Sequence, residues 1–408
     1  MYARELILGH IDLSRENDAF FSECLLCRAC VDMCFSAVKT DEIVLAGRRA
    51  SGRVRGMSPV YTYIFNDLLP DHQKLGRVVR LAASTRRIVP IQVIHALRIF
   101  GWTGLVRGTH RVAPSEPAET KLERADQFLR EIPKTFLRER LAQRGLTGGT
   151  KQAAFFVGCG TNFMFPHVGE ASIDVLEKLG YQVTVLENGC CGLPAFAHGA
   201  LEAAQRLAIK NIAAFSDGRD SLIVTDCSSC ASFLKDYPKL LLMGNPPDKA
   251  VLLEAEAFSA RVRDITELLK DGDRPHFFHG ETARPAKKMG AVPISLRRVT
   301  FHDPCHLSRH QKLQAVAREA LRSLPSIDFI EMKEADWCCG GAGSFAVEHP
   351  DLSLKILDRK IQNIISSGAD TIVTTCPACL MQIRSGLKQR GSTIRALHLA
   401  EIAHEYMV

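Results

Sequence analysis

The residues best suited to chemistry in this sequence are its fourteen cysteines, which fall into three groups along 408 residues. The first group is Cys24, Cys27, Cys30 and Cys34. The second group is Cys159, Cys190, Cys191, Cys227 and Cys230. The third group is Cys305, Cys338, Cys339, Cys376 and Cys379. Because every cysteine belongs to a group, we interpret them as metal-binding or redox residues and not as core filler.

The second and third groups form an internal repeat. Each begins with a cysteine that follows an apolar run, continues to a Cys-Cys-Gly triplet and ends with a Cys-x2-Cys pair. Equivalent cysteines are separated by 146, 148 and 149 residues, and LIVTDCSSC in the first copy matches TIVTTCPAC in the second. We therefore expect two halves of the same fold, each built around its own centre.

The Cys-Cys-Gly triplets indicate a turn around a bulky group. Adjacent cysteines on a regular strand would point to opposite faces, whereas Gly192 and Gly340 allow a turn and a close approach of the backbone. Five thiolates per repeat exceed the four that tetrahedral zinc needs, and a multi-iron cluster accommodates the surplus. A structural zinc site in each half and a metal-free redox dithiol stay as alternatives.

The first group has the spacing Cys-x2-Cys-x2-Cys-x3-Cys of bacterial ferredoxins, which predicts a [4Fe–4S] cluster. Phe35 stands where that motif usually has proline, and the chain carries one copy of the motif. In two-cluster ferredoxins the fourth cysteine binds the other cluster. Either Cys34 closes its own cluster or a first motif lies upstream, and our hypothesis is the second alternative, which an in-frame upstream motif would support.

Short β-branched runs alternate with amphipathic helices in both halves, which predicts right-handed βαβ units and an α/β fold with two parallel sheets. The predicted helix faces are Ile173, Leu176 and Leu179, then Leu201, Ala204, Ala208, Ile212 and Phe215, and in the second half Val316, Ala320 and Leu324, then Leu354, Leu357, Ile361 and Ile365. Cys227 and Cys376 each follow a strand and begin a helix. Ligands bind at that edge of such sheets, and a helix N-terminus there favours a thiolate.

A basic segment lies between the first group and the repeats. From His72 to Arg111 there is no acidic residue, while eight lysines and arginines lie among apolar residues. The segment suits a helical connector with a solvated basic face, a docking surface for a partner protein, or a contact with an anionic membrane. The connector is the plainest of these interpretations. Residues 112–120 and 276–297 are predicted linkers because of their prolines.

Several functional classes receive no support from the sequence. A net charge of +7 does not by itself imply nucleic acid. No apolar run reaches the length of a membrane span, and the first ten residues lack the apolar stretch of a signal peptide. We find no Walker motif, dinucleotide fingerprint or catalytic triad, so flavin and NAD are not expected here. Candidates to hydrogen-bond cluster sulfurs, or only to cap loops, are His198, His302, Asp303 and His306.

The repeated pattern resembles the cysteine-rich CCG domain family. This domain occurs in the heterodisulfide reductase B chain, the anaerobic glycerol-3-phosphate dehydrogenase C chain and the iron–sulfur subunit of glycolate oxidase and related lactate-oxidising complexes. The order of domains is most similar to the glycolate oxidase subunit, as are the stretches ARELILGHIDL, CLLCRACVDMCFSAVKTDEI and FSARVRDITELL. We accordingly assign residues 1–50 to a small, mainly helical ferredoxin-like region, 51–150 to a basic connector, 151–255 to a first CCG domain, 256–297 to a linker and 298–408 to a second CCG domain.

The resemblance also implies cofactors. In heterodisulfide reductase B, the five cysteines of a CCG motif bind a noncubane [4Fe–4S] cluster. Carried over, this predicts such a cluster at one or both of the two five-cysteine groups, each domain being Rossmann-like. A [4Fe–4S] cluster at the four N-terminal cysteines completes the set.

The function implied by the resemblance is electron transfer. The chain would be an oxidoreductase subunit of a flavin-dependent glycolate or lactate dehydrogenase. It would relay electrons from an FAD-containing subunit towards quinone or another acceptor, in the cytoplasm or peripherally on the inner face of the membrane. The main alternative is a disulfide or heterodisulfide reductase with catalysis at the CCG clusters. A relay like the glycerol-3-phosphate dehydrogenase C chain and a zinc scaffold are further alternatives.

Overall fold

The short apolar runs form two four-stranded parallel sheets, one in each repeat. They are seen in a computed structural model that describes residues 2–13, 20–88, 118–144, 149–217, 221–269 and 296–407. The first sheet has the order β2-β1-β3-β4, with strands β1 (Lys151–Phe155), β2 (Tyr181–Val185), β3 (Leu222–Thr225) and β4 (Val262–Asp264). The second has the order β6-β5-β7-β8, with strands β5 (Arg297–Phe301), β6 (Ile327–Phe329), β7 (Thr371–Thr374) and β8 (Arg395–His398). The predicted α/β class with two parallel sheets is confirmed.

Helices connect the strands of each half. In the first half they are α10 (Cys159–Phe163), α11 (Pro166–Lys178), α12 (Leu193–Ala197), α13 (Leu201–Ala214), α14 (Ser228–Lys235), α15 (Tyr237–Leu241), α16 (Lys249–Arg261) and the 3₁₀ helix η2 (Ile265–Leu269). In the second half they are the π-helix η5 (His306–His310), α17 (Gln314–Arg322), α18 (Phe345–Glu348), α19 (Pro350–Ser366), α20 (Pro377–Gln389) and α21 (Leu399–Tyr406). Because parallel strands need crossovers, almost every strand is followed by a helix.

The predicted helix faces are largely buried. On α13 the apolar stripe from Leu201 to Ile212 lies in the core, and α11 is followed by Gly180 with φ of 85°. On α19 the prediction was wrong at Ile365, which is 45% exposed, while Ile364 is fully buried. Ile364 lies seven residues after Leu357, and this spacing keeps both side chains on one stripe of a 3.6-residue helix.

The predicted linker at 256–297 needs correction at its start. Residues 256–269 continue the first half as the end of α16, strand β4 and η2. Phe258, Val262 and Ile265 are fully or almost fully buried there. A three-residue strand gives too short a pattern to be seen in the sequence, so the fourth strand of the sheet was missed. Residues 270–295, most of the predicted linker, lie outside the described residues.

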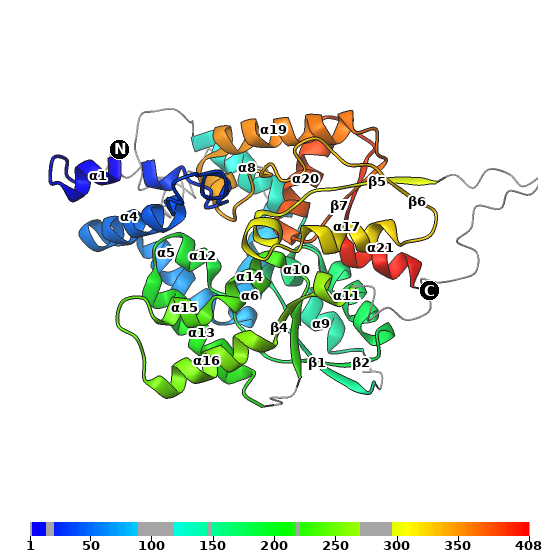
Figure 1. The fold of residues 1–408 in the computed structure, drawn as a ribbon, viewed down its shortest axis with the longest axis horizontal. Coiled ribbons are helices and arrows are strands. Elements are labelled where there is room, and N and C mark those ends of the chain that lie inside the picture. Colours follow the sequence, from blue (N-terminus) through cyan, green and yellow to red (C-terminus); the bar gives the residue numbers. More distant parts are fainter. Residues whose placement is uncertain are drawn as a thin grey trace, which may run out of the picture.

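The N-terminal part is helical and packs beside both halves (Figure 1). Its helices are α1 (Tyr2–Ile7), α3 (Ala29–Asp32), α4 (Thr40–Arg55), α5 (Pro59–Tyr63), the π-helix η1 (Ile64–Leu68), α6 (His72–Ile88), α8 (Ala118–Arg130) and α9 (Leu137–Leu141). Helix α6 starts the predicted basic segment, and residues 89–117 of that segment are outside the described ranges. Arg80 and Arg86 of α6 pair with Glu139 and Asp126 inside the connector. In the described ranges no helix is long and apolar enough to cross a bilayer.

The two halves pack directly on each other. Helix α11 of the first half lies along α21 of the second, and Lys178 donates a hydrogen bond of 2.7 Å to the carbonyl of Met407. At the carboxyl ends of the strands, the loop after β3 meets the loop after β7, because Ser228 donates to the Thr375 hydroxyl at 2.7 Å. Both hydrophobic clusters that fill the halves contain residues from each, so apolar packing continues from one half into the other.

Candidate metal centres

The cysteines of the two repeats lie in the segments that follow the carboxyl ends of the strands. Cys159 starts α10 after β1, and Cys227 is the residue before α14 after β3. Cys376 is the residue before α20 after β7. The Cys-Cys-Gly turns lie after β2 and β6. The N-termini of α14 and α20 therefore lie at the two Cys-x2-Cys pairs, where they favour thiolates or an anionic group.

The first centre is a connected set of five thiols. Cys190 contacts Cys159 and Cys191, Cys191 contacts Cys230, and Cys230 contacts Cys227. Hydrogen bonding to Cys191 and Cys227, with burial, raises the pKa of Cys230 well above its usual range. Without a cation, so many buried thiolates could not coexist. The five thiols therefore suit a metal–sulfur group with several metal ions. A single tetrahedral zinc ion would use four of them and leave one unused.

The second centre repeats most of this arrangement. Cys339 Sγ lies 3.4 Å from Cys379 Sγ, and Cys339 also contacts Cys338 while Cys379 contacts Cys376. Cys305 stands apart from this chain of contacts, and its Sγ lies 3.4 Å from Nδ1 of His306. Burial raises the pKa of the Cys305 thiol well above its usual range.

The two centres share one cavity. A cavity of about 850 Å³ is lined by all ten cysteines of the repeats and by Cys24 of the first group. Cys227 of the first centre and Cys376 of the second are in hydrogen-bonding contact, and Ser229 Oγ lies 3.4 Å from Cys376 Sγ. The structure thus brings into contact two cysteines, Cys227 and Cys376, that are 149 residues apart in the sequence.

The glycines of the triplets adopt the expected backbone. Gly192 has φ of 96° and Gly340 has φ of 78°, in the left-handed region that favours glycine. The amide N–H of Gly340 donates to Cys338 Sγ at 3.4 Å, and that of Gly192 donates to Cys190. The turn therefore aims amides, as well as two thiols, towards each centre.

The N-terminal group lies against the second centre. Leu26 and Arg28 both have positive φ, and the amide of Leu26 donates to Cys24 Sγ at 3.4 Å. Cys27 is in hydrogen-bonding contact with Cys338. Cys30 is exposed and Cys34 is half-buried at the end of α3. The loop is thus open on one side and adjoins the second centre on the other.

Arg48 of α4 holds this loop in place. Its guanidinium donates to the carbonyls of Phe21, Ser22 and Cys24 and, on the first half, of Ala197 at 2.5 Å. One side chain thus joins the cysteine loop to the repeat. Hydrogen bonds from a charged donor contribute roughly 1.5–3 kcal/mol each.

Replacing Arg48 by alanine is expected to release the N-terminal loop. We expect the purified protein to lose the metal of the first group and to keep that of both repeats. Metal content per chain after anaerobic purification, together with the spectrum of each centre, measures this. Arg49→Ala is the matched control, because Arg49 is its neighbour on α4 and contacts Met243 Sδ at 3.7 Å, away from the cysteine loop. Equal losses in the two variants would contradict the role of Arg48.

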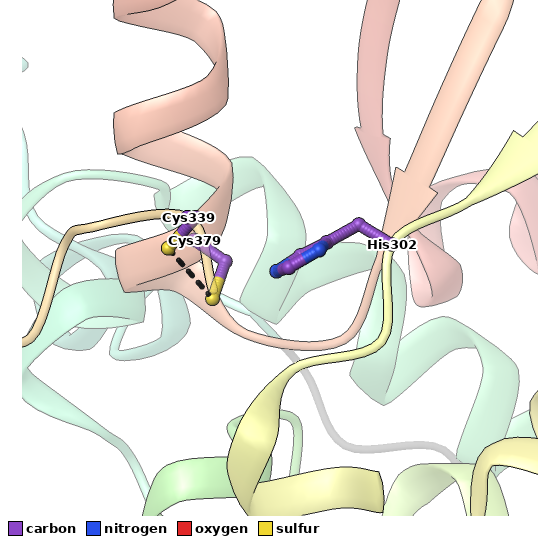
Figure 2. Close-up of side chains that lie close together, drawn as sticks. All are labelled: His302, Cys339 and Cys379. Carbon is purple, nitrogen blue, oxygen red and sulfur yellow. Dashed lines mark hydrogen bonds between the residues drawn. The ribbon is translucent and has the colours of Figure 1, made fainter. Parts of the chain in front are cut away.

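Of the polar residues proposed from the sequence, two lie at a centre. His306 contacts Cys305, and His302 points at Cys339 and Cys379 (Figure 2). Asp303 instead forms an ion pair with Arg318, with an oxygen–nitrogen distance of 2.7 Å. His198 lies in the cavity wall and contacts Ser344 Oγ at 2.7 Å.

Three groups at the centres escaped the sequence analysis. His72 Nε2 lies 3.5 Å from Cys159 Sγ, while Arg138 donates to His72 Nδ1 at 3.3 Å. Burial lowers the pKa of His72 to about 4, so the ring is neutral and presents its Nε2–H to the sulfur. Lys360 is fully buried next to the second centre. Of these three residues, only Lys360 had a signal in the sequence, because a lysine inside the apolar stripe of a helix is unusual. His72 and Arg138 reach the site only because segments far apart in the sequence pack together.

The surroundings of the cysteines fit an anionic metal–sulfur group. Neither ring nitrogen of the buried His302 has a hydrogen-bond partner among the described residues. Lys360 forms no ion pair with a carboxylate of any described residue, and burial lowers its pKa to about 8. Buried donors and buried charges are normally paired, so the free ring nitrogens of His302 and the buried charge of Lys360 suit an acceptor and a negative charge at the second centre.

Comparison with known proteins agrees with the site. The family model described as "Cysteine-rich domain" (CCG) matches residues 153–235 and 299–384. The chain is 30% identical over 253 residues to lactate utilization protein A of Exiguobacterium sp., covering 62% of this chain and 96% of that protein. The chain belongs to this family of paired CCG-domain iron–sulfur proteins.

Two further relatives widen the family. The probable glycolate oxidase iron-sulfur subunit of Bacillus subtilis is 27% identical over 407 residues, which cover 97% of this chain and 84% of that protein. One chain of the fumarate reductase (CoM/CoB) of Methanothermobacter marburgensis is 30% identical over 251 residues, covering 61% of this chain and 45% of that protein. The resemblance predicted from the cysteine pattern is thereby confirmed.

Proposed function

We propose that this CCG-family chain is the electron-transfer subunit of a flavin-dependent 2-hydroxy acid dehydrogenase. The observation that carries the proposal is the continuity of the three cysteine groups. Cys27 of the first group contacts Cys338 of the second centre, and Cys376 of that centre contacts Cys227 of the first centre. Such contacts suit a relay, in which electrons pass between adjoining centres without any acid–base chemistry by the protein.

The proposed cofactors follow the ligand sets. We assign a [4Fe–4S] cluster to the N-terminal group and noncubane [4Fe–4S] clusters to the five-cysteine centres. Iron–sulfur clusters supply one-electron steps, with a potential set by net charge, burial and hydrogen bonds to sulfur. The chain's own part is to hold the thiolates, to exclude water by burying seven of the ten repeat cysteines, and to direct amides and His72 at the sulfurs.

The proposed partner is an FAD-containing subunit. Oxidation of glycolate or lactate releases two electrons, which the clusters would accept one at a time and pass towards quinone or another acceptor. The relatives named as a glycolate oxidase iron-sulfur subunit and as lactate utilization protein A support this substrate class. We place the complex in the cytoplasm, with peripheral contact at the inner face of the membrane as the route to a quinone.

The test combines composition with electron transfer. Protein purified without oxygen should contain iron and acid-labile sulfide, and its cluster absorbance should bleach when glycolate or lactate is added together with an FAD-containing 2-hydroxy acid dehydrogenase subunit. The same mixture without the hydroxy acid is the control. An iron-free preparation that is fully active in its native assay would end the proposal, and zinc without sulfide would establish the scaffold instead.

A second candidate is a disulfide reductase. The observation in its favour is that both five-cysteine centres open into the same cavity, which is also lined by polar side chains such as Tyr61 and His198. The relative from the fumarate reductase (CoM/CoB) is a member of the same family. Disulfide reduction by the purified chain with a viologen donor would favour this function, whereas hydroxy acid-dependent bleaching favours the relay.

A further inference from the structure

The two halves have matching backbones at the residue three positions before the first cysteine of each repeat. The amide of Phe156 donates to the carbonyl of Val224 at 2.8 Å, and the amide of His302 donates to the carbonyl of Val373 at 2.9 Å. Phe156 and His302 are separated by 146 residues, as are Cys159 and Cys305. The two residues therefore occupy equivalent positions, and their side chains can be compared directly.

Their side chains make different contacts. The ring of Phe156 is fully buried and stacks on Phe215 with 5.9 Å between ring centroids. His302 is almost as fully buried, but a ring nitrogen and the Sγ atoms of Cys339 and Cys379 all lie within 4.8 Å of one another. Figure 2 shows the imidazole directed at the two sulfurs. A ring nitrogen thus faces the second centre where the first centre has a hydrocarbon ring.

A second matched pair differs in charge. Asn211 on α13 and Lys360 on α19 are fully buried and 149 residues apart, which is also the separation of Cys227 and Cys376. Asn211 is neutral, and its side-chain amide donates a hydrogen bond of 2.9 Å to the carbonyl of Cys190. Lys360 Nζ donates to the carbonyls at positions 334 and 335, at 2.6 and 3.1 Å, and its charge acts on Cys339 and Cys338.

The charge of Lys360 is acted on by Asp303 and Asp336 as well as by the two cysteines, and each of these carboxylates also pairs with an arginine. Asp303 is paired with Arg318, and Asp336 is paired with Arg309. At the first centre the charge of Arg138 acts on Cys159, but Arg138 lies behind the neutral His72 and also pairs with Glu187 at 3.6 Å. Burial limits the screening of the Lys360 charge by water, whereas the equivalent position of the first half carries the neutral Asn211.

We propose that His302 and Lys360 make the two centres electronically unequal, with His302 supplying a nitrogen contact and both residues raising the reduction potential of the second centre above that of the first. This inference rests on the proposed function, because it assumes a cluster at each centre. Hydrogen bonds to sulfur and nearby positive charge both stabilise the reduced form. A single electron then reduces the second centre in preference to the first. The second centre also adjoins Cys27, and the step makes and breaks no bond.

The experiment replaces two residues of the second half so that they resemble the equivalent residues of the first half. His302→Phe installs the residue found at the equivalent position, and Lys360→Gln removes the charge but keeps a hydrogen-bond donor. A redox titration followed by electron paramagnetic resonance should show the midpoint of one centre falling in each variant, by at least about 59 mV, which corresponds to a tenfold change in a one-electron equilibrium. Lys355→Gln is the control, because Lys355 is an exposed lysine on the same helix.

Nitrogen labelling provides a readout independent of potential. Protein with ¹⁵N-histidine should show a nitrogen coupling to the second centre that disappears in His302→Phe. If the phenylalanine variant does not assemble its centre, His302→Gln, which retains a polar side chain, replaces it in both measurements.

Two outcomes overturn the inference. One is that no midpoint moves further than in Lys355→Gln, and the other is that no coupling is lost with His302. In both cases iron and two repeat centres are still present, so the proposed function survives. A protein without iron would instead remove the proposed function itself.

Discussion

Replacing Cys191 by serine is expected to remove the first centre and to leave the other two intact. Cys191 contacts Cys190 and Cys230, both of the same repeat, and it is buried. Iron–sulfur clusters select thiolate ligands, and a serine oxygen is a poor substitute. This centre should therefore lose its metal while the N-terminal and second centres keep theirs. Iron and sulfide content, with the paramagnetic signal of each reduced centre, measures the result.

Cys227→Ser is the informative comparison for this variant. Cys227 contacts Cys230 of its own centre and Cys376 of the second. We therefore expect Cys227→Ser to alter the signals of both repeat centres, whereas Cys191→Ser affects one. Loss of the N-terminal signal in a folded Cys191→Ser protein would show that the division into three centres is wrong.

Replacing Gly340 by alanine is expected to disrupt the second centre through the backbone alone. A Cβ at this position would lie 2.6 Å from the carbonyl oxygen of Ser353, and the residue has φ of 78°. Left-handed backbone costs an alanine about 1–2 kcal/mol, and a contact this short with rigid main chain adds roughly 1–3 kcal/mol. We expect a lower midpoint for thermal loss of cluster absorbance and partial loss of iron.

Gly343→Ala is the matched control for this prediction. Gly343 lies in the same loop and also has positive φ, at 63°, but a Cβ there would meet nothing within 4 Å. It should therefore show the conformational cost without the steric one. Equal thermal midpoints and equal iron content in Gly340→Ala and Gly343→Ala would contradict this prediction. The close approach of Gly340 to α19 would then not be needed for the second centre.

Much of the fold was predictable because its signals are local. Alternating β-branched runs and amphipathic stretches predict parallel βαβ units, and Cys227 and Cys376 were correctly expected between a strand and a helix. The errors lie where a local signal is weak. Strand β4 has three residues, and the choice between Ile364 and Ile365 depends on how α19 rotates against its neighbours.

The sequence by itself determined which side chains are available as ligands, their division into three groups and the repetition of the second group in the third. Spacing and residue type are properties of the chain, so these inferences needed no structure. Only the tertiary structure decided that the repeats share one cavity, that Cys27 adjoins the second centre, and that His302 and Lys360 face it. Each of these depends on the packing of segments far apart in the chain, for which the sequence carries no periodic signal.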